Sequence, residues 1–87
     1  MKVYEKLALV FLIGASRGRT EALNGNARRP DFNHPEEVTT MLDEAETLEE
    51  VTRLRIAFID GVRCGVEHAD MPDRKFLELH YKCETDS

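Results

Sequence analysis

Two cysteines and two histidines near the carboxyl-terminal end of the sequence have the side chains and the helical spacing of metal ligands. Cys64 precedes His68 by four residues, and His80 precedes Cys83 by three. Residues three or four apart share one face of a helix, so a hairpin turning near residues 70–73 would bring two thiolates and two imidazoles together. Such a set suits tetrahedral zinc, although the eleven-residue gap between the histidines matches no standard zinc-finger spacing. The alternative, which we favour, is two buried thiols and two histidines at helix borders, with no cofactor.

A group of arginines forms a second candidate site, in this case for an anion. They lie before and within a turn-rich stretch at residues 25–34, and they are Arg17, Arg19, Arg28 and Arg29. A guanidinium group binds phosphate or carboxylate through two parallel hydrogen bonds, so a nucleotide or a nucleic-acid backbone could bind here. Phe32 is the one aromatic residue in this stretch that could stack on a base. The alternative, which we favour, is that the arginines are solvated or pair with the acids of residues 36–50, within one chain or across a dimer.

Acidic residues are concentrated between residues 36 and 50, where the sequence has seven acids and no base. These acids are Glu36, Glu37, Asp43, Glu44, Glu46, Glu49 and Glu50. The first 34 residues carry six Lys or Arg and three Asp or Glu, which gives a net charge of +3. The remaining residues carry six Lys or Arg and fourteen Asp or Glu, which gives a net charge of −8. A concentrated charge of one sign attracts a partner of the opposite sign. We therefore expect the acidic stretch to bind a basic surface on a larger protein or complex, as an inhibitor, adaptor or regulator would.

A glycine motif, Gly14-Ala15-Ser16-Arg17-Gly18, follows an apolar run and resembles the glycine-rich turn of short-chain dehydrogenases/reductases. The resemblance implies a strand, a turn and a helix whose amino terminus holds the pyrophosphate of a dinucleotide. This sequence has Ile13 where the family has threonine, and Arg19-Thr20 where it has Ile-Gly. A chain of 87 residues is also too short for the six-stranded sheet of that fold. The alternative prediction is that Gly14 and Gly18 allow two helices to pack closely.

The sequence shows no complete set of catalytic residues. A cysteine and a histidine can act as nucleophile and base only with a cleft, an orienting third group and an oxyanion site. The paired acids at residues 36–37 and 49–50 suit helix starts, where negative charge is favourable. We predict that the protein is not an enzyme.

Length and composition indicate a single small domain that covers residues 1–87. The chain has 87 residues, of which 41% are hydrophobic and 33% charged. Its net charge of −5 argues against nucleic acid as the main partner, because nucleic-acid-binding domains are usually basic. The first 16 residues imitate a secretory signal without its cleavage pattern, and their apolar run is shorter than the roughly 20 residues that cross a bilayer. With two cysteines, the sequence predicts a cytoplasmic protein that does not enter a membrane.

The first predicted element is a long helix over residues 3–24, which ends at Asn24-Gly25. Its residues are apolar on nearly every face, so we expect burial on all sides. Pairing with the same helix of a second subunit would provide that burial, and we therefore predict a homodimer or larger homo-oligomer. A strand over residues 7–13 is the alternative, because a short apolar run has no decisive period.

Three further helices complete an all-α prediction, a small bundle of about four helices finished by homodimerisation. A short helix should begin at Pro35, capped by Asn33 or His34. The Thr47-x-x-Glu50 capping box should begin a long amphipathic helix that ends near His68, and a last short helix should precede a frayed tail at residues 84–87. The short helix should bury Val38, Met41, Leu42 and Ala45, and the long one Val51, Leu54, Phe58, Val62 and Gly65, with Ile59 and Val66 beside them.

Overall fold

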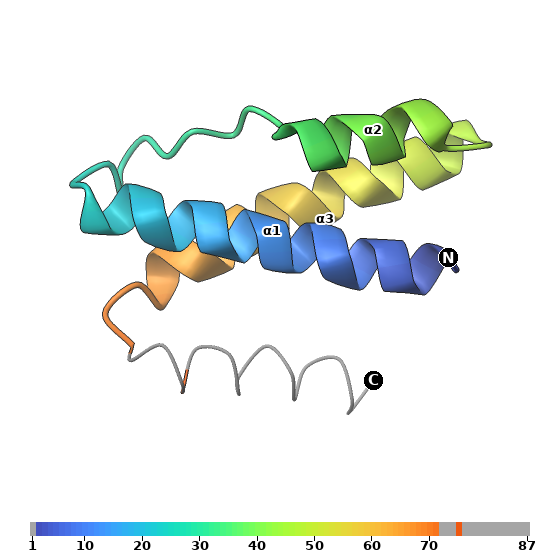
Figure 1. Ribbon diagram of the computed structural model, residues 1–87. Helices are drawn as coiled ribbons and strands as arrows, with labels where there is room; N and C mark the ends of the chain where they lie inside the picture. Colours follow the sequence, from blue (N-terminus) through green and yellow to red (C-terminus); the bar gives the residue numbers. More distant parts are fainter. Residues whose placement is uncertain (1, 72–74, 76–87) are drawn as a thin grey trace.

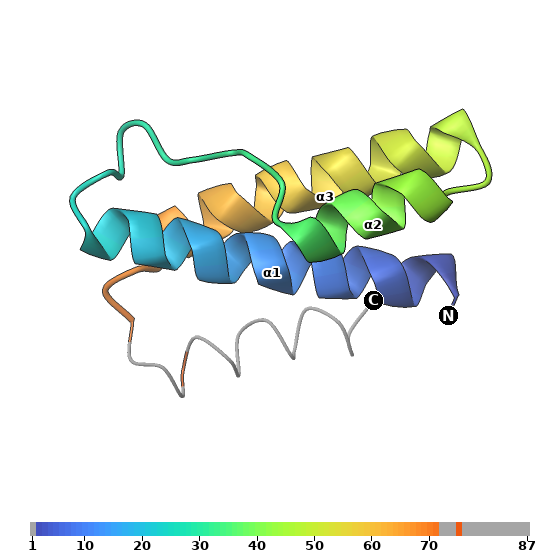
Figure 2. The same ribbon diagram turned by 45° about the horizontal axis from the view of Figure 1, so that its top comes forward.

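The computed structural model describes residues 2–71 and residue 75. The described residues form three α-helices, α1 (Val3–Leu23), α2 (Glu36–Glu44) and α3 (Leu48–Glu67) (Figure 1). Helices α1 and α3 lie side by side and run in the same direction, and α2 packs along one side of this pair in the opposite direction (Figures 1 and 2). The all-helical prediction is confirmed for this part of the chain. The predicted last helix and the tail lie outside the described residues.

Helix α1 forms where the sequence predicted it, so the strand alternative over residues 7–13 is wrong. The backbone N–H of Lys2 donates to a carboxylate oxygen of Glu5 at 3.2 Å, which satisfies one of the amides left unpaired at the helix start. At the other end Asn24 caps the helix, and Gly25 follows with a φ of +87°, a backbone conformation that glycine adopts without strain. The predicted stop at Asn24-Gly25 is therefore confirmed.

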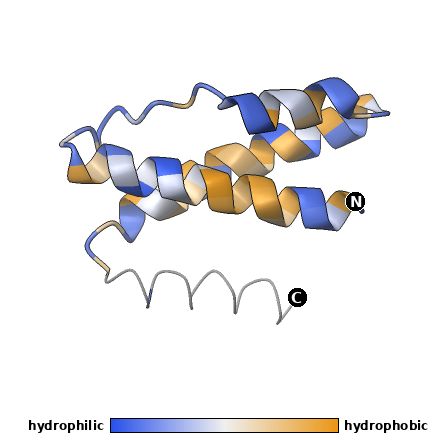
Figure 3. Cartoon of the chain, viewed as in Figure 1, coloured by the Kyte–Doolittle hydropathy of each residue, from blue (hydrophilic) through white to orange (hydrophobic). Residues whose placement is uncertain are grey.

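The described helices alone do not bury α1 on all sides. The side chain of Tyr4 is 65% exposed and that of Leu9 is 38% exposed. Figure 3 shows that hydrophobic residues are concentrated in the amino-terminal half of α1 and that α2 is largely hydrophilic. Among the described helices α3 and α2 pack against α1, and they leave Tyr4 and Leu9 exposed.

Four glycines bring α1 and α3 into backbone contact. A methyl group built at Gly14 would lie 2.5 Å from the carbonyl oxygen of Phe58, and one at Gly18 would overlap the carbonyl of Val62. The glycines of α3 are the counterpart, because methyl groups at Gly61 and Gly65 would overlap the carbonyls of Phe11 and Ala15. Any larger residue would push the helix axes apart. We call α1 and α3 the glycine-packed pair.

The glycine-packed pair decides between the two interpretations of the Gly14–Gly18 motif. Both glycines are buried in the middle of α1 rather than in a turn after a strand. The interpretation as a dinucleotide-binding turn is therefore wrong, and the prediction of close helix packing is confirmed. The same spacing recurs at Gly61 and Gly65, a repeat that sequence reasoning missed.

The core lies where all three helices meet. The side chains of Val10, Val38, Leu54, Phe58 and Val62 are fully buried there. The partly buried Met41, Leu42 and Ala45 pack against them, which confirms the apolar stripe predicted for the short helix.

Helix α2 begins at Glu36 with Pro35 as its N-cap, so the predicted caps Asn33 and His34 are wrong. The imidazole of His34 packs edge-on against the ring of Phe58, with centroids 5.1 Å apart. His34 therefore contributes to the core and leaves the helix start without a side-chain cap.

Helix α3 follows its prediction closely. Thr47 Oγ1 accepts a hydrogen bond from the backbone N–H of Glu50 at 3.1 Å, the first half of the predicted capping box. The second half differs from the prediction, because the Glu50 carboxylate accepts from the backbone N–H of Glu46. The helix ends at Glu67, with His68 as its C-cap. On its predicted inner face Leu54, Phe58, Val62 and Gly65 are buried and Val51 is half-buried, as are Ile59 and Val66 beside it.

Candidate interaction surfaces

Six of the seven predicted acidic contacts form one exposed surface. Their side chains lie on α2, on the corner that joins it to α3 and on the first turn of α3, and none forms an ion pair with another described residue. We call this set the acidic surface; it comprises Glu36, Glu37, Asp43, Glu44, Glu46 and Glu49. Lys6 is a nearby cation that lines one hollow with Glu36, Glu37 and Glu44, and the excess of exposed carboxylates would still present a cationic partner with a negative field.

Two members of the acidic surface lie where they disfavour the helix. The carbonyl end of a helix carries partial negative charge, so acids there cost stability while acids in the first turn add to it. Glu36 and Glu37 occupy the first turn of α2, but Asp43 and Glu44 are its last two residues, and this last turn contains no basic residue. Local stability explains the first pair of acids and does not explain the second.

Glu50 differs from the other six acids because the fold engages its carboxylate. Glu50 is 8% exposed. One oxygen of its carboxylate lies 3.5 Å from Nζ of Lys6 on α1, and the other accepts a hydrogen bond from the backbone N–H of Glu46 at 2.9 Å. Burying a carboxylate is costly unless it is paired and hydrogen-bonded, and both conditions are met here. Glu50 ties the α2–α3 corner to α1, so its prediction as a partner-binding residue is corrected.

The four predicted anion-binding arginines do not converge. Arg17 forms an ion pair with Asp31 at 2.8 Å, and Arg19 donates to the backbone carbonyl of Met71 at 2.9 Å. Two residues apart on one helix, these side chains leave α1 on opposite sides. Arg28 and Arg29 are exposed and line a shallow hollow on the loop after α1. Arg17 also pairs with a loop acid rather than with an acid of residues 36–50, which differs from the pairing that we favoured.

The predicted zinc ligands are only half described. Cys64 is half-buried on α3, and His68 caps the helix one turn later, with its backbone N–H bonded to the carbonyl of Cys64 at 3.0 Å. His80 and Cys83 lie outside the described residues. Within residues 2–71 and residue 75, no three His, Cys, Asp or Glu side chains are grouped so that they could hold a metal ion. The zinc site therefore stays a prediction.

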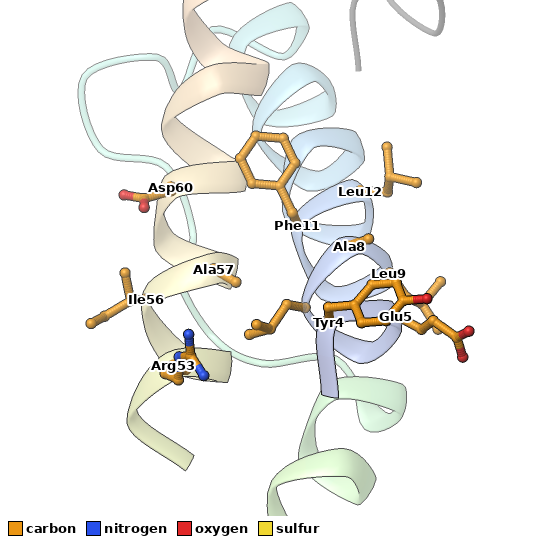
Figure 4. Close-up of a pocket in the computed structure, with 11 residues that line it drawn as sticks. Tyr4, Glu5, Ala8, Leu9, Phe11, Leu12, Arg53, Ile56, Ala57 and Asp60 are labelled. Carbon is orange, nitrogen blue, oxygen red and sulfur yellow. The ribbon is translucent and has the colours of Figure 1, made fainter. Parts of the chain in front are cut away.

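A groove that sequence reasoning missed runs between α1 and α3. It has a volume of about 750 Å³, and Figure 4 shows Phe11 lying between the two helices, with Arg53, Ile56 and Asp60 along the outer edge of α3. We call it the apolar groove; its lining comprises Tyr4, Glu5, Leu7, Ala8, Leu9, Phe11 and Leu12 of α1 and Arg53, Ile56, Ala57 and Asp60 of α3. The available signal was Ile56, a large apolar residue outside the predicted buried face of α3, which is 51% exposed.

Comparisons of the chain with models of protein families, with curated proteins and with solved structures give no match. Among the described residues no helix is both long enough and apolar enough to span a membrane.

Proposed function

We propose that this protein is a non-enzymatic interaction domain that binds a larger protein or complex and acts as its inhibitor, adaptor or regulator. The acidic surface would be the contact, and a basic patch on the partner would be its target. The observation that carries the proposal is the exposure of six carboxylates on α2, its corner and the first turn of α3, none of them in an ion pair with a described residue. Charge of this kind accelerates association and selects partners by sign.

The last turn of α2 gives the proposal its strongest support. Asp43 and Glu44 oppose the helix dipole there, so the fold itself gains nothing from their charges. Glu67 opposes the dipole of α3 in the same way, so the binding role rests on the grouping of Asp43 and Glu44 with four further exposed acids. The proposal extends to a homodimer that works in the cytoplasm without a cofactor, and the exposed apolar side chains of α1 support the dimer.

The test compares two variants that change the same charge in different places. Asp43→Lys with Glu44→Lys alters the acidic surface at the end of α2. Glu67→Lys with Asp70→Lys is the matched control, because Glu67 ends α3, Asp70 follows it and both are exposed. Each double variant replaces two acids with two bases, so each changes the net charge from −5 to −1. Both also remove acids from the carbonyl end of a helix, so neither should lower the thermal midpoint.

The measurement is capture of binding proteins by the immobilised chain from an extract of its source cells, followed by elution with increasing salt. We expect the α2 variant to lose its captured partner by about tenfold or more, the α3 control to retain it, and salt to release it from the wild type, since screening weakens exposed charges. Equal losses of captured partner in both variants would show that net charge alone matters, and would contradict the proposal that the acidic surface is the contact. Undiminished capture by the α2 variant would contradict it as well.

A further inference from the structure

The outer face of α3 carries two exposed charges of opposite sign with an apolar centre between them. Arg53 and Asp60 are seven residues apart, two helical turns, and therefore lie on the same side of the helix. Neither forms an ion pair with another described residue. Ile56 and Ala57 lie between them, and the side chain of Ile56 is 51% exposed. A large apolar residue flanked by unpaired charges is the composition of a small interface with a polar rim.

We propose that this face of α3, with the apolar groove beside it, binds a second copy of the chain in an antiparallel, two-fold symmetric dimer. The inference deepens the homodimer part of the proposed function, and of the acidic surface it uses Glu49 alone, in a peripheral contact. In the dimer Arg53 of each protomer pairs with Asp60 of the partner subunit. Ile56 and Ala57 face the partner's Ile56 and Ala57 across the two-fold axis.

The order of the residues along α3 favours an identical partner. The midpoint between Arg53 and Asp60 falls between Ile56 and Ala57, so a two-fold axis at that point places each arginine opposite the aspartate of the other copy. Glu49 and Arg63, both exposed, are symmetric about the same point to within one residue and provide a second, peripheral pair. Across the interface each positive charge therefore lies opposite a negative one. A second copy of α3 provides this complementary order of charges.

The apolar groove supplies the buried area that two ion pairs would not. Exposed ion pairs contribute little on their own, so apolar contact must provide most of the affinity. Tyr4 and Leu9, which α2 and α3 leave exposed, line the groove together with Ile56. Docking a second α3 along the groove would cover these side chains. It would also join α1 and α3 of each copy into four packed helices.

The experiment measures the dimer dissociation constant by sedimentation velocity over a range of protein concentrations. The wild type should reach twice the chain mass of 10.0 kDa. Arg53→Glu and Asp60→Arg should each weaken the dimer by about tenfold or more, because each places like charges opposite one another twice. The double variant Arg53→Glu with Asp60→Arg restores opposite charges and should recover the wild-type constant. The control is Arg55→Glu, an equal charge change at an exposed position of α3. Arg55 lies more than a third of a turn around the helix from both Arg53 and Asp60, so this change should have little effect.

Mixing the two single variants tests the antiparallel pairing separately from folding. An Arg53→Glu chain and an Asp60→Arg chain place opposite charges together at both ends of the interface, so the mixture should form a heterodimer although neither variant dimerises well alone. Recovery in the mixture and in the double variant would support the proposal. A wild type that stays monomeric would overturn it, whether residues 72–87 or a different protein covers the groove. A dimer that tolerates both single charge reversals would overturn it too.

Discussion

The glycine-packed pair and α2 are built in contrasting ways. In the pair, four glycines place the backbones of two long helices in direct contact, and buried residues of both helices complete the core. Helix α2 has nine residues, of which Val38 alone is buried, and it is anchored through side chains. The acids are concentrated on α2 and its corner, and α1 and α3 carry the apolar groove.

Under the proposed function, this difference separates the residues that stabilise the fold from those that contact a partner. Backbone contact leaves no room for change at four positions of the pair, so those positions are constrained by the fold. The carboxylates of α2 contact solvent and do not support the core, and two of them oppose their own helix dipole. Substitutions in the two regions should therefore have different consequences, the largest of them for stability in the pair.

Gly18→Ala and Gly65→Ala should have the largest effects on stability. Each would force a methyl group into the backbone of the facing helix, at Val62 or Ala15, and overpacking of this kind costs about 1–3 kcal/mol. That cost outweighs the gain of up to about 1 kcal/mol that alanine offers in an exposed helix. Urea denaturation monitored by circular dichroism provides the measurement. Ser16→Ala, on the exposed side of α1, is the control and should leave stability unchanged or slightly raised.

Glu50→Gln should have a smaller effect, because it weakens the link between the two regions rather than the pair itself. The glutamine keeps the shape of the side chain but loses the charge that faces Lys6, at a cost of about 1–2 kcal/mol. The exposed neighbour Glu49→Gln is the control and should change stability by no more than about 0.5 kcal/mol. Equal unfolding free energies for the two variants would mean that the buried carboxylate does not anchor the corner. Partner capture should survive in Glu50→Gln, because this carboxylate does not belong to the acidic surface.

The helices could be predicted from local signals, and the prediction failed where distant parts of the chain meet. Asn24-Gly25 and Thr47-x-x-Glu50 act on their own backbone, so they predicted the end of α1 and the start of α3 correctly. A capping signal is weaker where several residues compete: Asn33 and His34 both precede Pro35, and the packing of His34 on Phe58 decided the outcome.

The candidate site was harder to predict, because exposure depends on what the rest of the chain covers. The apolar sequence of α1 indicates that its surface needs neighbours but not which of its residues the rest of the chain leaves exposed, so the groove was missed. Glu50 belongs to the acidic stretch by sequence but is buried by its contact with Lys6, 44 positions earlier. The arginines were grouped by sequence, yet the helix and the loop separate them.

Native-state hydrogen exchange tests the division between the two regions most directly. The account predicts that the buried amides around Gly14–Gly18 and Gly61–Gly65 exchange only through global unfolding, whereas the amides at the end of α2 exchange about 100-fold faster through local opening. Their rates should also depend less on denaturant, because a local opening exposes less surface. If α2 and the glycine-packed pair exchanged at the same rate with the same denaturant dependence, they would form one cooperative unit and the division would be contradicted.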